Sequence, residues 1–352
     1  MLTHGSLFSG VGGLDLGFDA AGIETLWQCE INAQCRSVLA KHWPDATRYT
    51  DVSDVKGNEV KPVDILTFGS PCQDLSVAGK RAGFQDGTRS NLYFEAIRII
   101  EEMRHATDNQ YPRFAVWENV RGALSSNGGN DFLAAIQALA DIGAVDISWR
   151  VVNTCHFGPP QRRVRVFLVA DFGGECAGEV LAQPARVCWH PPAIRGKGKE
   201  TSTETEDSVA FDEYNYSLGD RIHHALRAGT KQSTGVLETF VKIIRSGARD
   251  TEGNLPAEVW RAEQVGPTLN VFDNGSESRA TVIVPEDIAY RVRRLTPREC
   301  ERLQGWTDDH TRWADTGKEL SDSARYKMCG NGISAPVAQW LGENLVQALT
   351  ND

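Results

Sequence analysis

Long apolar runs, paired cysteines and an excess of basic residues are all missing from this sequence of 352 residues. No apolar stretch approaches the ~18 residues that a membrane-spanning helix needs. The opening MLTHGSLFSG lacks the charged and apolar segments of a signal peptide. The 8 cysteines form no Cys-x-x-Cys pair and no Cys/His cluster with zinc-ligand spacing. We therefore expect a cytoplasmic protein with reduced thiols and no structural metal.

The net charge of −10 argues at first against a nucleic-acid partner, but the charge is unevenly distributed. Residues 186–298 contain 16 Lys/Arg and 16 Asp/Glu, so this segment is neutral and the rest of the chain holds the acidic excess. Salt screens charges beyond about 8–10 Å, so a neutral face can still bind phosphate. The overall charge therefore does not exclude nucleic acid.

Strand-like and helix-like patterns alternate through the first 170 residues. Short apolar runs predict strands at 5–8, 25–30, 63–70, 114–118, 147–153 and 164–170. Helical patterns lie between several of them, at 32–43, 92–103 and 130–142. This alternation predicts an α/β fold with a doubly wound, mostly parallel sheet. Ligands of such sheets bind outside the carboxyl ends of the strands.

The pattern changes after residue 172. A polar stretch at 191–208 is typical of a loop or linker, and 210–290 shows weak periodicity with short strands at 241–244 and 281–284. The sequence then predicts a helix at 296–305, capped by Thr296 with Pro297 in its first turn. It also predicts an amphipathic helix at 334–350. We expect a first domain at 1–185, a smaller irregular domain at 186–290, and a segment at 291–352 that returns to the first domain.

The motif FSGVGG (8–13) follows the first strand and opens a helix, so its glycines let the backbone approach a ligand. Its spacing differs from Gly-x-Gly-x-x-Gly, which disfavours a nicotinamide-dependent oxidoreductase. Glu30 ends the second predicted strand, where an acidic side chain can accept hydrogen bonds from ribose hydroxyls. Asp51 lies near the end of the next predicted strand. The alternative is a tight turn beside two solvated carboxylates.

Cys72 lies in GSPCQ, where Gly69 and Pro71 restrict the backbone at a strand end. A cysteine attacks as its thiolate. The ordinary thiol pKa is about 8.5, so either this pKa must be lowered or a base must assist. The glycine-rich loop that follows contains Lys80 and Arg81 and could close over an anionic substrate. The alternatives are a small buried hydrophobe and ordinary surface cations.

Glu118 in WENV ends another predicted strand, and Arg163 and Arg165 are two residues apart in QRRVR. Residues two apart lie on one side of a strand, so both guanidinium groups would need anionic or carbonyl partners there. A capping carboxylate and a salt-bridged strand end are the alternatives.

In this order along most of the chain, the motifs resemble those of the DNA cytosine C5-methyltransferases. RRLTPRECERLQGW (293–306) resembles the family segment after the recognition region, and GNGIS (330–334) its late cofactor motif. At that motif the family usually has a small residue and valine after Gly-Asn, where this chain has Gly332 and Ile333.

The resemblance implies S-adenosylmethionine as cofactor, a Rossmann-like methyltransferase domain at 1–185 and target recognition by 186–290. It implies addition of Cys72 to C6 of a flipped-out cytosine, with Glu118 at N3 and Arg165 at O2. Arg163 would help to place the nucleophile and the base. The implied cofactor-binding residues are Phe8, Gly10, Gly12, Gly13, Glu30, Ile31, Asp51, Val52, Pro71, Leu92, Asn331, Gly332 and Ile333. Those implied for DNA or for the loop over the base are Gln73, Ser76, Lys80, Arg81, Asn119 and Gln161.

Duplex DNA is the expected partner, and a monomer is expected because flipping one base needs no two-fold symmetry. A restriction endonuclease acting on the same sequence is a further candidate partner. Two alternatives stay open: a relative of the same fold that methylates cytosine in transfer RNA, and a catalytically silent DNA-binding relative. The neutral segment between QRRVR and RRLT favours DNA, and the intact motif residues argue against a silent protein.

Overall fold

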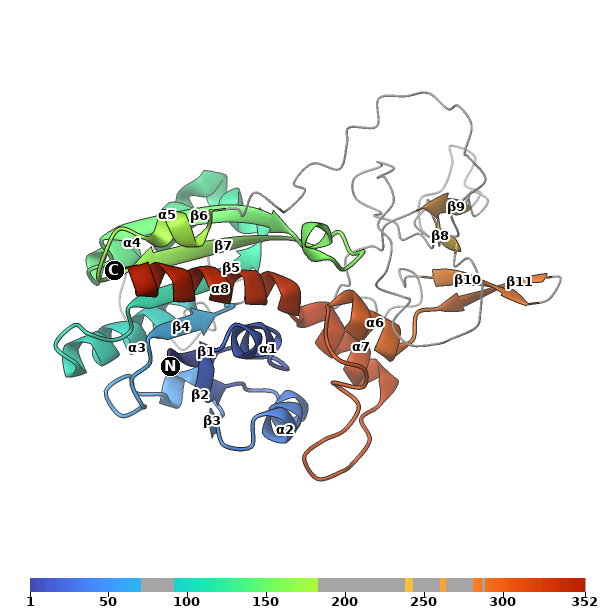
Figure 1. Ribbon diagram of the computed structural model, residues 1–352, viewed down its shortest axis with the longest axis horizontal. Helices are drawn as coiled ribbons and strands as arrows, with labels where there is room; N and C mark the ends of the chain where they lie inside the picture. Colours follow the sequence, from blue (N-terminus) through green and yellow to red (C-terminus); the bar gives the residue numbers. More distant parts are fainter. Residues whose placement is uncertain (71–91, 183–237, 243–259, 264–280, 287–288, 352) are drawn as a thin grey trace.

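The computed structural model describes residues 1–70, 92–182, 238–242, 260–263, 281–286 and 289–351; from 238 to 294 it describes the backbone only. Its main body is a seven-stranded sheet between two layers of helices (Figure 1). The strands are β1 (Thr3–Leu7), β2 (Glu24–Cys29), β3 (Thr47–Tyr49), β4 (Ile65–Phe68), β5 (Phe114–Val120), β6 (Asp146–Asn153) and β7 (Val164–Asp171).

The strand order β3-β2-β1-β4-β5-β7-β6 confirms the predicted α/β fold with a doubly wound, mostly parallel sheet. β7 alone is antiparallel to its neighbours, β5 and β6. The connection from β6 to β7 covers only residues 154–163, and a parallel crossover needs a dozen residues or more. The short connection therefore forces β7 to run back beside β6.

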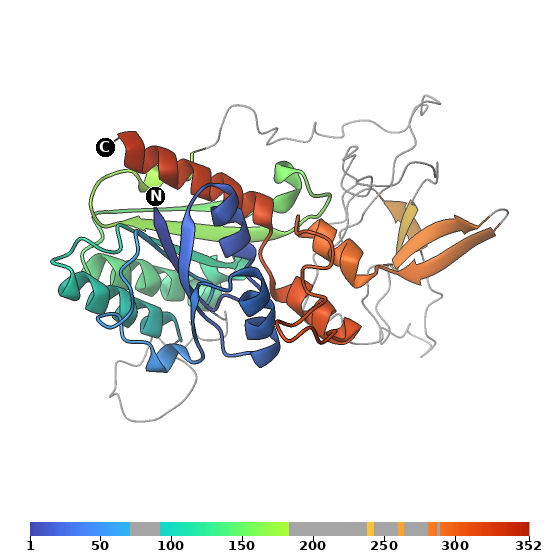
Figure 2. The same cartoon turned by 60° about the horizontal axis from the view of Figure 1, so that its bottom comes forward.

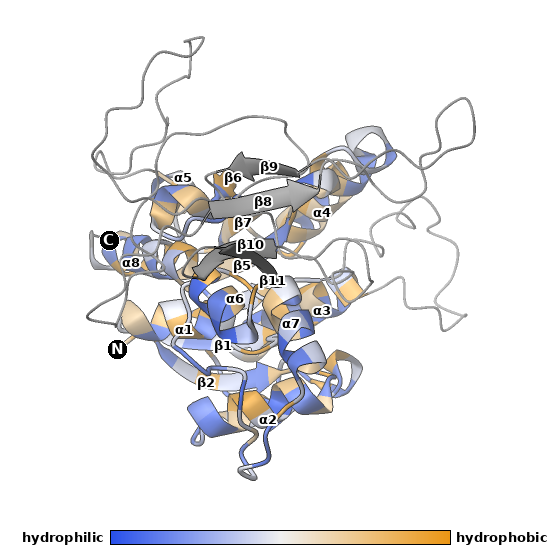
Figure 3. Cartoon of the chain, turned by 90° about the vertical axis from the view of Figure 1, so that its right-hand side faces the viewer, coloured by the Kyte–Doolittle hydropathy of each residue, from blue (hydrophilic) through white to orange (hydrophobic). Residues whose placement is uncertain are grey.

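Helices cover both faces of the sheet, as Figure 3 shows in a view along the strands. α1 (Gly13–Ala20), α5 (Ala177–Val180) and α8 (Ala335–Asn351) pack on one face, and α3 (Leu92–Ala106) and α4 (Asn130–Asp141) on the other. Successive strand residues alternate between the two cores: Phe114 and Val116 face α8, whereas Ala115 and Trp117 face α3 and α4. α2 (Ala33–His42) packs at the β3 end.

The short 3₁₀ turns are η1 (Val52–Asp54), η3 (Arg121–Leu124), η4 (Ser126–Gly129) and η5 (Thr154–Phe157). The returning segment adds α6 (Pro297–Leu303) and α7 (Asp322–Asn331) before α8. The predicted capping of α6 is confirmed: Glu299 N–H donates to Thr296 Oγ1 over 3.3 Å, and Thr296 N–H donates to Glu299 Oε2 over 2.7 Å. Arg325 of α7 reaches buried Glu301 of α6 at 3.0 Å, which fixes the two helices together.

A second sheet of order β11-β10-β8-β9 lies on the far side of α6 from the main sheet (Figure 2). It contains β8 (Glu238–Lys242), β9 (Trp260–Glu263), β10 (Thr281–Glu286) and β11 (Ala289–Arg294), all antiparallel. The strands predicted at 241–244 and 281–284 overlap β8 and β10. Among the described helices, none has the length and apolar character to cross a membrane.

His4 of β1 and Asp15 of α1 are fully buried titratable groups. His4 Nε2 is 2.8 Å from Thr67 Oγ1, and burial lowers the pKa of His4 to about 3. Asp15 accepts hydrogen bonds from Ser6 Oγ and Gln28 Nε2, yet burial raises the pKa of Asp15 to about 6. Burial also lowers the pKa of His310, near α6, to about 4. Folding therefore changes proton affinity in opposite directions at these sites.

We predict that stability falls as the pH drops from about 6.5 toward 4. In this range the unfolded chain protonates His4 and His310, whereas the folded chain does not, and Asp15 has the opposite effect below about 6. Relative to the folded chain, the unfolded chain binds two more protons at the histidines and one fewer at Asp15. These three groups together therefore contribute a slope of about 1.4 kcal/mol per pH unit. Urea unfolding of H4Q at pH 7, 6 and 5 should show a flatter slope than the parent chain. H105Q, at an exposed position of α3, is the control; equal slopes for H4Q and the parent would contradict the prediction.

Candidate active site

The predicted site residues that the structure describes gather at the carboxyl edge of the parallel strands. Four groups of elements meet there: the loop after β1, the ends of β2 and β3, the β5–β7 pair, and the turn between α7 and α8 (Figure 1). Pro71, Cys72, Gln73, Ser76, Lys80 and Arg81 lie outside the described residues, so their predicted roles stay predictions. The edge is the place where doubly wound sheets bind ligands.

The loop from Phe8 to Gly13, called here the glycine loop, has an unusual backbone. Phe8, Gly10 and Gly12 all have positive φ, of 57°, 57° and 81°. A side chain on Gly12 would meet the Trp43 ring at 2.3 Å, and one on Gly13 would meet the Ile333 carbonyl oxygen at 2.4 Å. Left-handed backbone at a non-glycine residue such as Phe8 costs about 1–3 kcal/mol and is found mostly where function needs it. These contacts account for glycine at positions 12 and 13.

Glu30 joins the glycine loop to the end of β2. Its Oε2 accepts a hydrogen bond from Gly10 N–H and its Oε1 from Asn32 N–H, both over 2.8 Å. Burial raises the pKa of Glu30, and these two backbone donors oppose that rise. A carboxylate has about four lone-pair sites, so Glu30 keeps acceptor capacity for a further hydroxyl. The neighbouring Ile31 side chain is 71% exposed, an apolar surface beside this carboxylate.

Asp51 lies at the start of η1, two residues beyond β3, where its Oδ1 accepts hydrogen bonds from Ser53 N–H at 3.0 Å and Ser53 Oγ at 2.8 Å. These bonds lower the pKa of Asp51, which is therefore an anion at neutral pH. The Val52 side chain is buried in the core, and Leu92, at the start of α3, packs against the same core. Val52 therefore belongs to the core, whereas Leu92 is only partly buried.

Glu118 and Arg165 form an ion pair on neighbouring strands. In the β5–β7 ladder, Glu118 lies opposite Phe167 and Val120 opposite Arg165, so the two charged side chains are diagonal neighbours on one face. Glu118 Oε1 is 3.1 Å from Arg165 Nε, and the two side chains are only 11% and 16% exposed. The sequence placed both residues at this edge but did not pair them.

Asn119 and Trp117 fix the end of the neighbouring strand through Ser70. Asn119 Nδ2 donates to the Ser70 carbonyl oxygen and Trp117 Nε1 to Ser70 Oγ, each over 3.2 Å. Ser70 comes directly before Pro71 and Cys72 in the chain. The described part of the GSPCQ motif is thus held against β5, on which Glu118 lies.

Arg163 was expected beside Arg165 on a strand, but β7 begins at Val164 and Arg163 precedes it. The side chain of Arg163 is buried, and its Nη2 donates to the Gly332 carbonyl oxygen over 2.6 Å. Both arginines nevertheless line one small cavity, together with Phe167 and Ile333. Gln161 is fully buried, and neither atom of its amide has a hydrogen-bond partner among the described residues.

The turn after α7 packs directly behind the glycine loop. Asn331 is exposed at the end of α7, and a side chain on Gly332 would meet the Trp306 ring at 2.2 Å. Trp306 Nε1 donates to the Ile333 carbonyl oxygen over 2.9 Å. The requirement for glycine at 332 therefore comes from the Trp306 ring, a contact that the sequence did not predict. The sequence did not predict the contact of His310 either. His310 Nε2 is 2.8 Å from the Val11 carbonyl oxygen, and the two residues are 299 positions apart in the chain.

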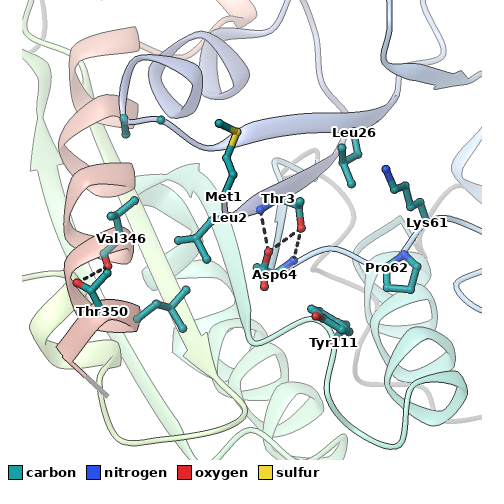
Figure 4. Close-up of a pocket in the computed structure, with 13 residues that line it drawn as sticks. Met1, Leu2, Thr3, Leu26, Lys61, Pro62, Asp64, Tyr111, Val346 and Thr350 are labelled. Carbon is teal, nitrogen blue, oxygen red and sulfur yellow. Dashed lines mark hydrogen bonds between the residues drawn. The ribbon is translucent and has the colours of Figure 1, made fainter.

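A larger cavity of about 660 Å³ lies at the opposite edge of the sheet, between the start of β1 and the end of α8 (Figure 4). Leu2, Leu26 and Val346 contribute apolar surface, and Asp64 Oδ2 already accepts hydrogen bonds from Thr3 N–H and Oγ1. None of the predicted site residues lines it. The carboxyl edge, where the glycine loop and the Glu118–Arg165 pair meet, is the better candidate.

Comparison with known proteins agrees with this geometry. A sequence model described as C-5 cytosine-specific DNA methylase matches residues 2–347. The Type II methyltransferase M2.BsuMI of Bacillus subtilis is 31% identical over 344 residues, which cover 97% of this chain and 75% of that protein. M.Bsp6I of a Bacillus species is 27% identical over 354 residues, covering 99% and 100%. The chain belongs to the C-5 cytosine-specific DNA methylase family.

The fold also matches solved structures. The S. pombe Dnmt2 methyltransferase superposes with a TM-score of 0.61 at 16% identity, covering 99% of each chain. At this identity the likeness supports the fold alone.

Members of this family use S-adenosylmethionine as the methyl donor. The described residues fit that group. Around Gly10, no described heavy atom lies within 4 Å of the position of a Cβ, so the loop has open space there. The Glu30 and Asp51 carboxylates offer acceptors for hydroxyl and amine groups, and exposed Ile31 offers an apolar surface for a ring.

We predict that G13A binds S-adenosylmethionine at least tenfold more weakly than the parent chain. The new methyl group would overlap the Ile333 carbonyl oxygen, and overpacking of this kind typically costs about 1–3 kcal/mol. Titration calorimetry measures the affinity. G22A is the control for general destabilisation, since Gly22 has a positive φ of 81°, which strains an alanine, but lies in open space in the turn before β2. Similar weakening in both variants would mean that general destabilisation, not the loop, is responsible.

Proposed function

We propose that this protein is a DNA (cytosine-5-)-methyltransferase that modifies a flipped-out cytosine in a specific duplex sequence with Cys72 as nucleophile. The observation that carries the proposal is the Glu118–Arg165 pair, which lies beside the strand end that leads through Ser70 to Cys72. An acceptor and a fork of donors, side by side and largely buried, suit the polar edge of a pyrimidine. The family membership of the chain supports the reaction.

Cytosine C5 is a poor nucleophile, and the proposed role of Cys72 is to change that. Its thiolate adds to C6, so that a sulfur–carbon bond forms and electron density moves toward C5. Glu118 engages N3 and Arg165 the O2 carbonyl, where they stabilise the charge that develops in the ring. Arg163, tied to the Gly332 carbonyl, holds this corner of the site in place.

When bound, S-adenosylmethionine supplies an electrophilic sulfonium methyl group to C5. The C5 proton then leaves to solvent or a nearby base, the sulfur–C6 bond breaks, and Cys72 is released as thiolate. We assign cofactor binding to the glycine loop residues Phe8, Gly10, Gly12 and Gly13, with Glu30, Ile31, Asp51 and Asn331 around them. Pro71, Leu92, Gly332, Ile333 and Val52 would shape the pocket.

A cytosine inside a duplex is out of reach of these groups, so the base must leave the helix at a cost of a few kcal/mol. We assign contacts with the DNA or the flipped base to Gln73, Ser76, Lys80, Arg81 and Gln161. The buried, unpaired amide of Gln161 supports its assignment, since buried polar groups are rarely left without a partner. Asn119 acts through Ser70 on the position of Cys72.

A covalent trap tests the proposed reaction. Fluorine at C5 cannot leave as a proton does, so 5-fluorocytosine in a duplex that the protein methylates should hold Cys72 after methyl transfer. A denaturing gel should show a shifted band that requires both S-adenosylmethionine and Cys72. C72S should give no band, and E118Q should slow methylation by about 10²–10⁴, the usual contribution of a positioned proton-transfer group.

The same gel separates the alternatives. A band with fluorinated transfer RNA but not with duplex DNA would move the protein to the transfer RNA reaction. The absence of a band on a duplex that is known to be methylated would refute the Cys72 mechanism. Cofactor binding without methyl transfer to any nucleic acid would indicate a silent DNA-binding relative.

We further propose that residues 186–290 recognise the target sequence and that 1–185 and 291–352 form the catalytic domain. Sequence is read mainly through side chains in the major groove, so the segment that carries them should carry specificity. Exchange of 186–290 for the matching segment of M.Bsp6I should change the methylated sequence, as bisulfite sequencing of plasmid DNA would reveal. A chimera that methylates the original sequence would refute this assignment.

We also propose that the protein acts as a monomer in the cytoplasm, with duplex DNA as its macromolecular partner. The Type II names of the relatives support a restriction endonuclease with the same target as a further partner of the system.

A further inference from the structure

His310 lies in the turn segment between α6 and α7 and is 1% exposed. Its Nε2 is 2.8 Å from the carbonyl oxygen of Val11, which sits between Gly10 and Gly12 in the glycine loop. Because a carbonyl can only accept, His310 must carry a proton on Nε2. The segment between α6 and α7 thus contacts the glycine loop through the Nε2–H of His310, which donates to the Val11 carbonyl oxygen.

Three aromatic side chains hold this donor in place. The His42 ring of α2 stacks on the His310 ring with centroids 4.1 Å apart and planes 18° apart, and His42 Nε2 lies 2.9 Å from the His310 carbonyl oxygen. Trp306 packs against His310 at 5.3 Å and Trp43 at 6.3 Å. The position of the His310 ring is therefore fixed from several sides.

The same rings also contact the backbone of the site. Trp43 fills the space beside Gly12, and Trp306 fills the space beside Gly332 and donates to the Ile333 carbonyl oxygen. His310 supplies the matching contact at Val11. Together Trp43, Trp306 and His310 hold the glycine loop and the turn behind it in place. Of these three side chains, His310 is the one that contacts a peptide group between Gly10 and Gly12.

We propose that His310 is a positioning residue for S-adenosylmethionine, which fixes the Val11 peptide and thereby the direction of the glycine-loop backbone that faces the cofactor. The inference rests on the proposed role of the glycine loop. Gly10 N–H is held by Glu30 and Gly12 N–H by the Ser9 carbonyl oxygen, and both glycines have a positive φ. His310 adds the recorded contact to the Val11 carbonyl oxygen between them. His310 makes no contact with the reacting groups Glu118 and Arg165 that the structure records, so its effect should appear in cofactor affinity rather than in the chemical step.

Two variants separate the hydrogen bond from the packing. H310F keeps an aromatic ring against His42 and Trp306 but removes the donor, whereas H310Q keeps an N–H donor of similar reach and removes the ring. We expect calorimetry to show about tenfold weaker S-adenosylmethionine binding by H310F, which is about 1.4 kcal/mol and near the value of one hydrogen bond. H310Q should recover most of that loss. In methylation assays KM for the cofactor should rise about tenfold in H310F, with kcat within twofold of the parent.

D171N is the control for general damage. Asp171 is buried at the end of β7, where it accepts hydrogen bonds from Arg113 Nε over 2.7 Å and from Gly173 N–H over 2.9 Å, and it has no recorded contact with the glycine loop or with His310. D171N should lower the melting temperature and leave cofactor affinity unchanged. Parent-like binding by H310F, or an equal loss in D171N, would overturn the inference while leaving the proposed function intact. Failure of the parent chain itself to bind S-adenosylmethionine would refute the cofactor site and the inference together.

Discussion

The close approach of two backbones, at Gly13 and Ile333, is the constraint on which the site depends. There is no room for a side chain between them, since a Cβ on Gly13 would lie 2.4 Å from the Ile333 carbonyl oxygen. The contact joins the first loop of the chain to the turn before its last helix. Arg163 adds a hydrogen bond to the Gly332 carbonyl at the same turn, so the loop, the β7 start and α8 share one point of attachment. The edge of the sheet is complete only when the returning segment is in place.

The Glu118–Arg165 ion pair shows how two charged side chains can be held in place, largely buried, at that edge. Both side chains are largely buried, and burial of a charge is costly unless a partner compensates for it. Each charge compensates the other, while Glu118 Oε1 has no hydrogen bond among the described residues and so keeps acceptor capacity. In the proposed reaction, N3 and O2 of the cytosine would meet charged groups that are already held in place and already removed from water. Preorganised groups of this kind stabilise charge better than water, because they need little rearrangement.

Sequence periodicity predicted the strands of the seven-stranded sheet and most of the helices that cover it, because burial on alternating faces leaves a clear pattern in residues such as Phe114 to Trp117. It did not predict α7, whose sequence DSARYKMCGN has a weak apolar stripe and two residues of low helix propensity at its end. The apolar run at 164–170 predicted where β7 begins, but the placement of Arg163 on the same strand was wrong, because Arg163 directly precedes Val164. β9 and β11 were likewise not predicted.

For the site, the sequence located the residues but not their partners. Glu30 directly follows β2, Glu118 lies near the end of β5, and Arg165 lies near the start of the antiparallel strand β7, so closeness to a strand end, which is a local property, brings all three to the expected edge. The supports act over long separations: Trp306 reaches Ile333, and His310 reaches Val11 across 299 positions. A histidine in DDHT carries no local signal of such a contact, since the partner is a backbone carbonyl that every residue possesses. Positioning by main-chain contacts is therefore the part of this site that only the fold can reveal. Such contacts also explain why Trp43, Trp306 and His310 are aromatic or imidazole rings. A large rigid side chain can reach and hold a backbone at little cost in side-chain entropy.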